Sequence, residues 1–176
     1  MIADVVEELA KAEIGDTFNF YRDGPRANLR RRRLREYLGS RVDAPFLLVG
    51  EAPGYRGARV SGIPFTSERQ LNGTGPAEAT ASIVHRVLDE LGLEESVLLW
   101  NVVPTHPGTE SSNRRPARRE IEEGVTFAHR LARGRQVLAV GRLAEGALGA
   151  PYIRHPSHGG AESFRAALAH QCCSAP

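Results

Sequence analysis

The chain has 176 residues, a formal net charge of +2 and a sequence pI near 8.8. Domains commonly hold about 100 to 200 residues, so we expect a single domain over residues 1–176 that buries roughly 70% of its unfolded surface. The mild charge excludes any argument for nucleic-acid binding from net charge alone, because such binding depends on a local patch.

Residues 1–40 are expected to form a helical N-terminal preface of two short helices, joined by Gly15 to Pro25. Acidic residues interrupt the first apolar pattern, so we expect neither a signal peptide nor a membrane span. The second helix is predicted from Asn28, as its N-cap, to Leu38, with Gly39 as a C-terminal stop.

After residue 40 the apolar residues no longer recur only at helical spacing, and short continuous apolar runs begin. Four short apolar runs are typical of buried strands: Pro45 to Gly50, Ser96 to Asn101, Gln136 to Val140 and Pro151 to Arg154. Between the first three lie apolar residues at helical spacing, namely Ile83, Val84, Val87, Leu88 and Leu91, then Ile121, Val125, Ala128 and Leu131. Alternating strands and helices predict an α/β fold, a three-layer α/β/α sandwich with a four-stranded, mostly parallel central sheet.

The two cysteines, Cys172 and Cys173, are adjacent and offer neither a CxxC pair nor a four-thiolate set. We therefore predict no metal, no iron–sulfur cluster and no other cofactor, and a reducing cytoplasmic location. The segment 171–176, which holds both cysteines, is expected to fray, and neither cysteine is given a function.

Ligands of parallel sheets bind beyond the carboxyl ends of the strands. That rule selects three polar loops: Gly50 to Ser67, Asn101 to Arg115, and His155 to Gly160. In the first, glycines and prolines allow close backbone approach to a ligand and place the Glu51 carboxylate at a strand end. Taken alone, this loop fits a catalytic carboxylate, a phosphate-gripping turn or an ordinary connection equally well.

Taken together, the three loops resemble the motifs of the uracil-DNA glycosylase superfamily. Gly50-Glu51-Ala52-Pro53-Gly54 with Gly62-Ile63-Pro64-Phe65 is similar to its GEAPG and GxPF motif. The strand-terminal Asn101 and the His155-Pro156-Ser157 signature follow in the expected order. Each motif is weak alone, whereas their joint occurrence over residues 46–160 is specific.

The resemblance implies a pocket for a base flipped out of DNA. Gly50, Ala52, Phe65 and Asn101 would bind that base, with Phe65 stacking on it and the Asn101 amide pairing with the O4 and N3–H edge of uracil. The resemblance also implies two catalytic residues. His155 would donate to the base O2, and Glu51 would position water and favour the cationic sugar.

Three departures from the family pattern affect the chemistry. Ala52 stands where the best-known branch has a water-activating aspartate, so Glu51 must take that work or catalysis is slow. Gly54 stands where that branch blocks the thymine methyl group with tyrosine, which predicts an open pocket, and Gly159 replaces the usual leucine wedge. The branch that shares GEAPG generally carries a four-cysteine iron–sulfur cluster, so this chain is identified as a cluster-free relative.

Candidate DNA contacts lie in the same loops, because serine hydroxyls and arginines there can grip phosphates beside a flipped nucleotide. They are Arg56, Arg59, Ser67, Arg114, Ser157 and His158. The basic run Arg30 to Arg33 with Arg35 is equally consistent with a DNA contact and with a solvated face paired with acids such as Glu36.

These inferences predict a monofunctional DNA glycosylase of base-excision repair. We expect it to act on DNA containing uracil, hypoxanthine or another deaminated base and to release the free base. We also expect a monomer that does not associate with a membrane. Two alternatives remain open. One is a slow or non-catalytic binder of damaged bases on the same fold, which Ala52 suggests. The other is an unrelated nucleotide-binding enzyme, although no Lys-Ser/Thr phosphate motif and no GxGxxG is present.

Overall fold

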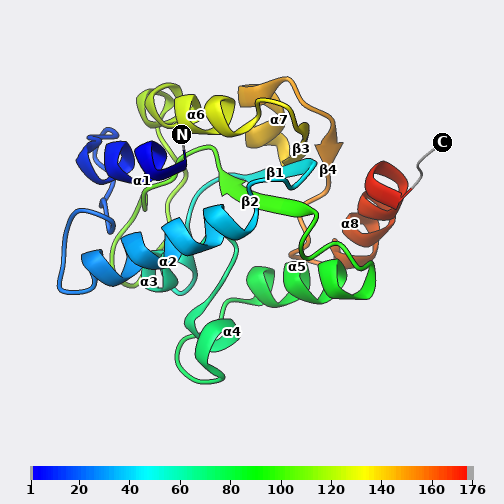
Figure 1. Cartoon of the computed structure of the whole chain (residues 1–176), viewed down its shortest axis with the longest axis horizontal. Coiled ribbons are helices and arrows are strands. Elements are labelled where there is room, and N and C mark those ends of the chain that lie inside the picture. The colour runs from blue at the N-terminus through cyan, green and yellow to red at the C-terminus, as the bar shows by residue number, and fades with distance from the viewer. Residues whose placement is uncertain (1, 174–176) are drawn as a thin grey trace.

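The computed structural model describes residues 2–173 (Figure 1). Its centre is a sheet of four strands, β1 (Phe46–Gly50), β2 (Val97–Asn101), β3 (Gln136–Val140) and β4 (Tyr152–Ile153). Every pairing is parallel and the spatial order is β2-β1-β3-β4. The predicted α/β class and the four strands are confirmed, and the sheet is parallel throughout rather than mostly so.

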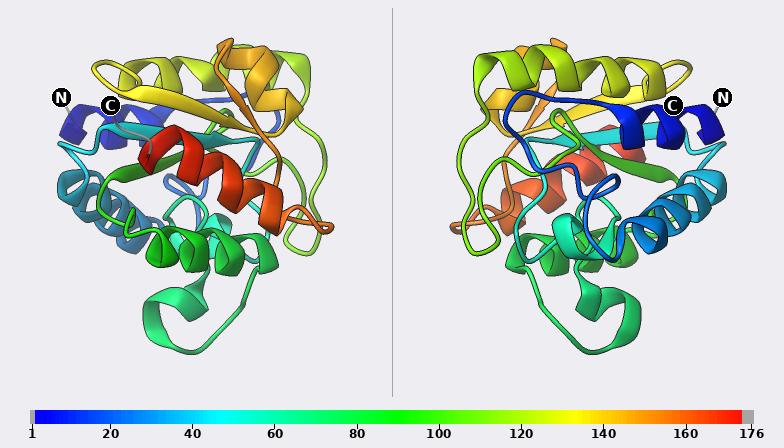
Figure 2. Two further views of the ribbon diagram at one scale, coloured as in Figure 1. Left: turned by 90° about the vertical axis from the view of Figure 1, so that its right-hand side faces the viewer. Right: turned by 90° about the vertical axis from the view of Figure 1, so that its left-hand side faces the viewer.

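Helices surround this sheet. They are α1 (Ile2–Lys11), α2 (Ala27–Ser40), α3 (Ala58–Ser61), α4 (Glu68–Asn72), α5 (Ala79–Glu90), α6 (Arg118–Leu131), α7 (Arg142–Leu148), α8 (Ala161–Leu168) and the π-helix η1 (Ala169–Cys173). Figure 2 shows the sheet between a layer containing α6 and α7 and a layer containing α5 and α8. The predicted three layers are thus present.

Alternation along β1 divides the apolar core into two clusters. Leu47 and Val49 point to one face and join residues of α1, α2, α6 and α7, whereas Leu48 points to the other face and joins α5 and α8. All three side chains are fully buried. A strand covered on both faces therefore carries a continuous apolar run, as the sequence pattern indicated.

Helix α2 covers the exposed edge of the sheet at β2. The Leu99 N–H of this edge strand donates to the Tyr37 hydroxyl oxygen at 2.7 Å, so the helix satisfies a backbone donor that an edge strand leaves free. The predicted boundaries of this helix were wrong. Asn28 lies inside it and Arg26 is the N-cap, and Gly39 continues the helix instead of ending it. Nothing lies within 4 Å of the Gly39 Cβ position, so the glycine has no steric role there.

The C-terminal end of the described chain differs from the prediction. Residues 171–173 belong to η1, where the sequence predicted a frayed tail, and residues 174–176 lie outside the described part. Cys172 is half-buried and packs against the second core cluster. No helix among residues 2–173 has the length and apolar character needed to cross a bilayer.

Candidate active site

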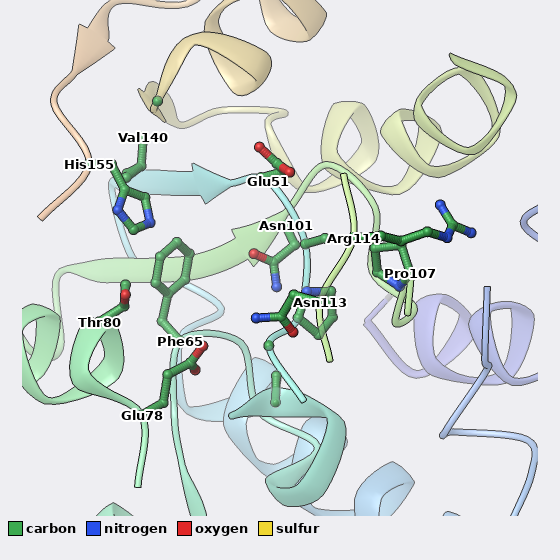
Figure 3. A pocket seen from close by; sticks show the side chains of 15 residues that line it. Glu51, Phe65, Glu78, Thr80, Asn101, Pro107, Asn113, Arg114, Val140 and His155 are labelled. Atoms are coloured by element: carbon green, nitrogen blue, oxygen red, sulfur yellow. The ribbon is translucent and has the colours of Figure 1, made fainter. Parts of the chain in front are cut away.

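A cavity of about 390 Å³ opens at the carboxyl ends of the strands. Chain order reverses between β1 and β3, so this is the switch point at which parallel sheets bind ligands. All three predicted loops contribute to it. Glu51, Phe65, Asn101 and His155 line the cavity together (Figure 3), although they come from widely separated parts of the sequence.

Phe65 and Asn101 meet over the last residue of β1. A Cβ on Gly50 would lie 2.2 Å from Phe65 Cζ and 3.2 Å from Asn101 Oδ1. Gly50 and Asn101 are also register partners across β1 and β2. The glycine is therefore required because the phenyl ring occupies the space of any larger residue. The Asn101 amide has no hydrogen-bond partner among residues 2–173 and remains free to pair with a ligand.

The hydrogen bonds of His155 assign its tautomer. The Ser157 backbone N–H donates to His155 Nδ1 at 3.2 Å, and the Ser157 hydroxyl lies 2.7 Å from the same nitrogen. Because Nδ1 accepts, the proton of the neutral ring sits on Nε2. Burial, with a smaller contribution from His158, lowers the pKa of His155. The ring is consequently a neutral Nε2–H donor at neutral pH.

Glu51 lies directly after β1 and its carboxyl group lines the cavity without a hydrogen-bond partner among the described residues. Burial raises the pKa of Glu51, and the positive charge of Arg115 partly opposes that shift. Ala52 also lines the cavity and packs against the first core cluster. Since alanine offers no polar atom, Glu51 is the carboxylate that the motif places at this end of the cavity.

Phe65 adopts a backbone conformation that is uncommon for an aromatic residue, with φ of 53°. The surrounding turn is fixed by side-chain hydrogen bonds. The Ser61 hydroxyl donates to the Thr66 carbonyl oxygen at 2.6 Å, and the Thr66 hydroxyl lies 2.9 Å from His85 Nε2. Such strain persists only where neighbouring structure holds it, and here it presents the ring to the cavity.

Part of that support comes from the basic run in α2. Arg30 is buried and donates to the Phe20 and Val60 carbonyl oxygens, at 3.1 and 3.2 Å. Arg33 donates to the Ser61 carbonyl oxygen at 3.2 Å and forms a bidentate pair with Glu68, at 2.9 and 3.0 Å. For these two arginines neither reading of the run was right, because they brace the turn that carries Phe65.

Two other arginines of the run behave differently. Arg32 is exposed and lies 3.9 Å from Glu36, and Arg35 pairs with Glu7 at 2.6 Å. These two arginines therefore fit the expectation of a solvated face paired with acids.

The three arginines predicted to contact DNA differ in exposure and in their partners. Arg56 is exposed beside the cavity and stacks on Tyr55. Arg59 pairs with Glu110 at 3.1 Å, and its side chain is 14% exposed. Arg114 lines the cavity but is held by the buried carboxylate of Glu120, at 2.8 Å. Arg56 is therefore the most available of the three for a phosphate.

The other predicted DNA-contacting residues, two serines and a histidine, also differ from one another in exposure. Ser67 is fully buried and caps α4 through Gln70, a location that favours a structural role over DNA contact. Ser157 and His158 lie in the loop after β4, where His158 is exposed with φ of 53° and its Nδ1 is 2.9 Å from the Ser157 hydroxyl. The hydroxyl thus links His158 to His155.

Sequence reasoning missed several lining residues, above all Glu78 and Asn113. Asn113 accepts from the Tyr55 N–H at 2.9 Å and so joins the first two loops. Glu78 corrects the expectation of an open pocket at Gly54, because a Cβ there would lie 2.0 Å from Glu78 Oε1. A carboxyl group fills the space that the missing tyrosine leaves. Neither residue belongs to a motif, although Asn113 lies within the second predicted loop.

The N-terminal preface supports the second loop. Phe18 and His106 exchange backbone hydrogen bonds at 2.9 and 3.0 Å, and His106 Nδ1 lies 2.8 Å from the Pro53 carbonyl oxygen. His106 is fully buried, so residues 1–40 reach the cavity loops through it. This gives the preface a positioning role that its sequence did not indicate.

No group of three or more His, Cys, Asp or Glu side chains within residues 2–173 could hold a metal ion. The cluster of the GEAPG branch does not fit this chain, since its donor set requires four thiolates and the sequence has two cysteines.

An aromatic platform, a free amide and a neutral imidazole donor are the kinds of group with which proteins bind an extruded nucleobase, and all three line this strand-end pocket. The sequence model of the uracil DNA glycosylase superfamily matches residues 37–170. The chain therefore belongs to this superfamily, whose members are DNA glycosylases. This membership argues against an unrelated nucleotide-binding enzyme.

The solved structures include a similar fold. The wild-type SMUG2 of Pedobacter heparinus superposes with a TM-score of 0.71 at 14% identity, covering 98% of this chain and 99% of that one. At this identity the match supports the fold alone. A search of curated proteins gave no match.

Proposed function

We propose that this protein is a monofunctional DNA glycosylase that hydrolyses the N-glycosidic bond of uracil flipped out of DNA. The observation that carries the proposal is the convergence of Glu51, Asn101 and His155 on one cavity beside the Phe65 ring. An aromatic face, a planar amide and an N–H donor match the face, the O4 and N3–H edge, and the O2 of uracil.

Bond cleavage places positive charge on the sugar and negative charge on the departing base. The neutral Nε2–H of His155 stabilises the charge that develops on O2, in the manner of an oxyanion donor. Glu51, once ionised, orients water toward the sugar carbon and stabilises its positive charge. The water then adds to that carbon and gives up a proton, and the departing uracil anion takes up a proton, so the products are free uracil and an abasic site.

The exposed residues at the rim support the DNA part of the proposal. Arg56 is available for a phosphate on one side of the cavity, and Ser157 and His158 extend from the loop on the other. The glycine-rich segment around Gly159 lets backbone approach the strand closely, and Gly159 has nothing within 4 Å of its Cβ position. We assign the grip on the flipped nucleotide to these two rims.

The test is single-turnover release of base from an oligonucleotide carrying one uracil, with lesion binding measured in parallel. Glu51→Gln and His155→Ala should each slow release by at least about a hundredfold while binding stays largely intact. Glu95→Gln and His129→Ala, the same kinds of change at exposed positions, should leave release unchanged.

Two outcomes would count against the proposal. Near-normal release by Glu51→Gln would remove this carboxylate from the mechanism. Tight binding of uracil DNA by the wild-type protein without any release would instead indicate the slow or non-catalytic binder that Ala52 suggests.

A further inference from the structure

The second carboxyl group of the cavity, Glu78, has no role in the scheme above. It is the N-cap residue of α5, and its side chain lies against the backbone of the first loop. A Cβ on Gly54 would lie 2.0 Å from Glu78 Oε1, and one on Gly57 would lie 1.8 Å from Oε2. Figure 3 shows Glu78 and Glu51 at opposite ends of the cavity, with Phe65 and Asn101 between them.

No hydrogen bond or ion pair to another residue in 2–173 satisfies the Glu78 carboxyl group. Burial alone raises its pKa above the ordinary value of 4.5. Of the neighbouring cations, Arg59 pairs with Glu110 and Arg114 pairs with Glu120, whereas Arg56 is exposed and stacks on Tyr55 without contacting Glu78. The other titratable groups of the cavity are Glu51, at its opposite end, and His155, which is hydrogen-bonded to Ser157. Partial burial of an unpaired carboxyl group favours its protonated form, which can donate a hydrogen bond.

The proposed base pose relates Glu78 to one edge of the base. With Asn101 on the O4 and N3–H edge and His155 on O2, the edge that carries the 5-position is left for the remaining wall of the cavity, where Glu78 lies against Gly54. The 5-methyl group of thymine and the N7 acceptor of a purine lie on the same edge of a base pair. A purine held by Phe65 and Asn101 would therefore direct N7 toward the carboxyl group that fills the space beside Gly54.

We propose, on the basis of the function given above, that Glu78 is a general acid for deaminated purines and hands its proton to N7 of hypoxanthine. The bond from C1′ to N9 then breaks and its electron pair stays on the base, which leaves as the neutral N7–H tautomer. Water adds to C1′ and gives up one proton, and solvent returns a proton to Glu78. Uracil has no N7, so its release depends on His155 and not on Glu78.

The experiment compares single-turnover release of hypoxanthine and uracil by the wild-type protein and by Glu78→Gln. Positioned acids contribute about 10² to 10⁴ in rate. We expect Glu78→Gln to slow hypoxanthine release at least about a hundredfold and to leave uracil release within about threefold, while Glu95→Gln changes neither. With hypoxanthine the wild-type rate should also fall as pH rises through the pKa of Glu78, a limb that Glu78→Gln lacks.

A substrate analogue that lacks N7 tests whether this atom receives the proton. In 7-deazahypoxanthine a carbon replaces N7, so the wild-type protein should release it no faster than Glu78→Gln does. Equal losses for uracil and hypoxanthine in Glu78→Gln, or an unchanged hypoxanthine rate, would overturn the proposal. A wild-type protein that releases uracil but no hypoxanthine refutes this inference alone, whereas release of neither base refutes the proposed function as well.

Discussion

The pair between Arg33 and Glu68 offers a direct measurement of how α2 supports the cavity. The Arg33 side chain is 16% exposed and that of Glu68 is 9% exposed. Removing one partner of a buried pair costs about 3 to 5 kcal/mol, and the residual exposure places this pair near the lower limit. We therefore expect Arg33→Met to lower the free energy of unfolding by about 3 kcal/mol, and the loss of the Ser61 contact to loosen the Phe65 turn.

Chemical denaturation of Arg33→Met, Glu68→Gln and the double variant forms a thermodynamic cycle, whose coupling free energy should be about 1 to 3 kcal/mol. Arg32→Met is the matched control, since Arg32 is exposed and its variant should cost less than about 0.5 kcal/mol. The hydrogen bond from Arg33 lowers the pKa of Glu68. The stabilisation that this ion pair gives is therefore complete above pH 4.5, the ordinary pKa of a glutamate, and is lost as the pH falls through the lower pKa of Glu68 in the folded state. Equal costs for Arg33→Met and Arg32→Met would refute the reasoning.

Two further predictions concern the cavity itself. Gly50→Ala places a methyl group within 2.2 Å of Phe65 Cζ and should displace the ring; since stacking is worth about 1 to 3 kcal/mol, uracil release should fall about ten- to a hundredfold. Gly39→Ala, which meets nothing within 4 Å, is its control, and equal rates for both variants would contradict this role of Gly50. The rate of uracil release should decrease as pH falls through the raised pKa of Glu51, because only the ionised carboxylate acts. If Glu51→Gln shows the same decrease at low pH, the decrease comes from another group.

Much of the fold could be predicted because strand and helix periods differ. The run from Gln136 to Val140 has the observed strand boundaries. Strands β1 and β2 each begin one residue later than predicted, and β4 is one residue shorter at each end. Helix ends were harder. Gly39 satisfies a stop rule, yet the helix continues through it because Tyr37 and Leu38 are held against β2 and the core. Packing there outweighs the local preference of glycine.

The cavity-lining residues could be predicted from the sequence where they belong to a motif, and not elsewhere. Phe65, Asn101 and His155 follow recognisable strand ends, and the parallel sheet brings those ends together. Glu78 precedes a helix that carries no motif, and its position depends on how α5 packs against Gly54 and Gly57. Charge runs were equally ambiguous, since adjacent arginines on α2 point to different surroundings, and burial decides which of them are structural.

The two carboxyl groups of the cavity need opposite protonation states if one site is to serve both pyrimidines and purines. Burial raises the pKa of each, but only Glu51 has a cation, Arg115, that opposes the shift. This cation favours the ionised form of Glu51, and within residues 2–173 no such charge acts on Glu78. In the proposed scheme, the ionised carboxylate of Glu51 acts at the sugar and the protonated carboxyl group of Glu78 acts at the base edge. A pair of acids separated in this way is how a single pocket assigns one carboxyl group to water and the other to the leaving group.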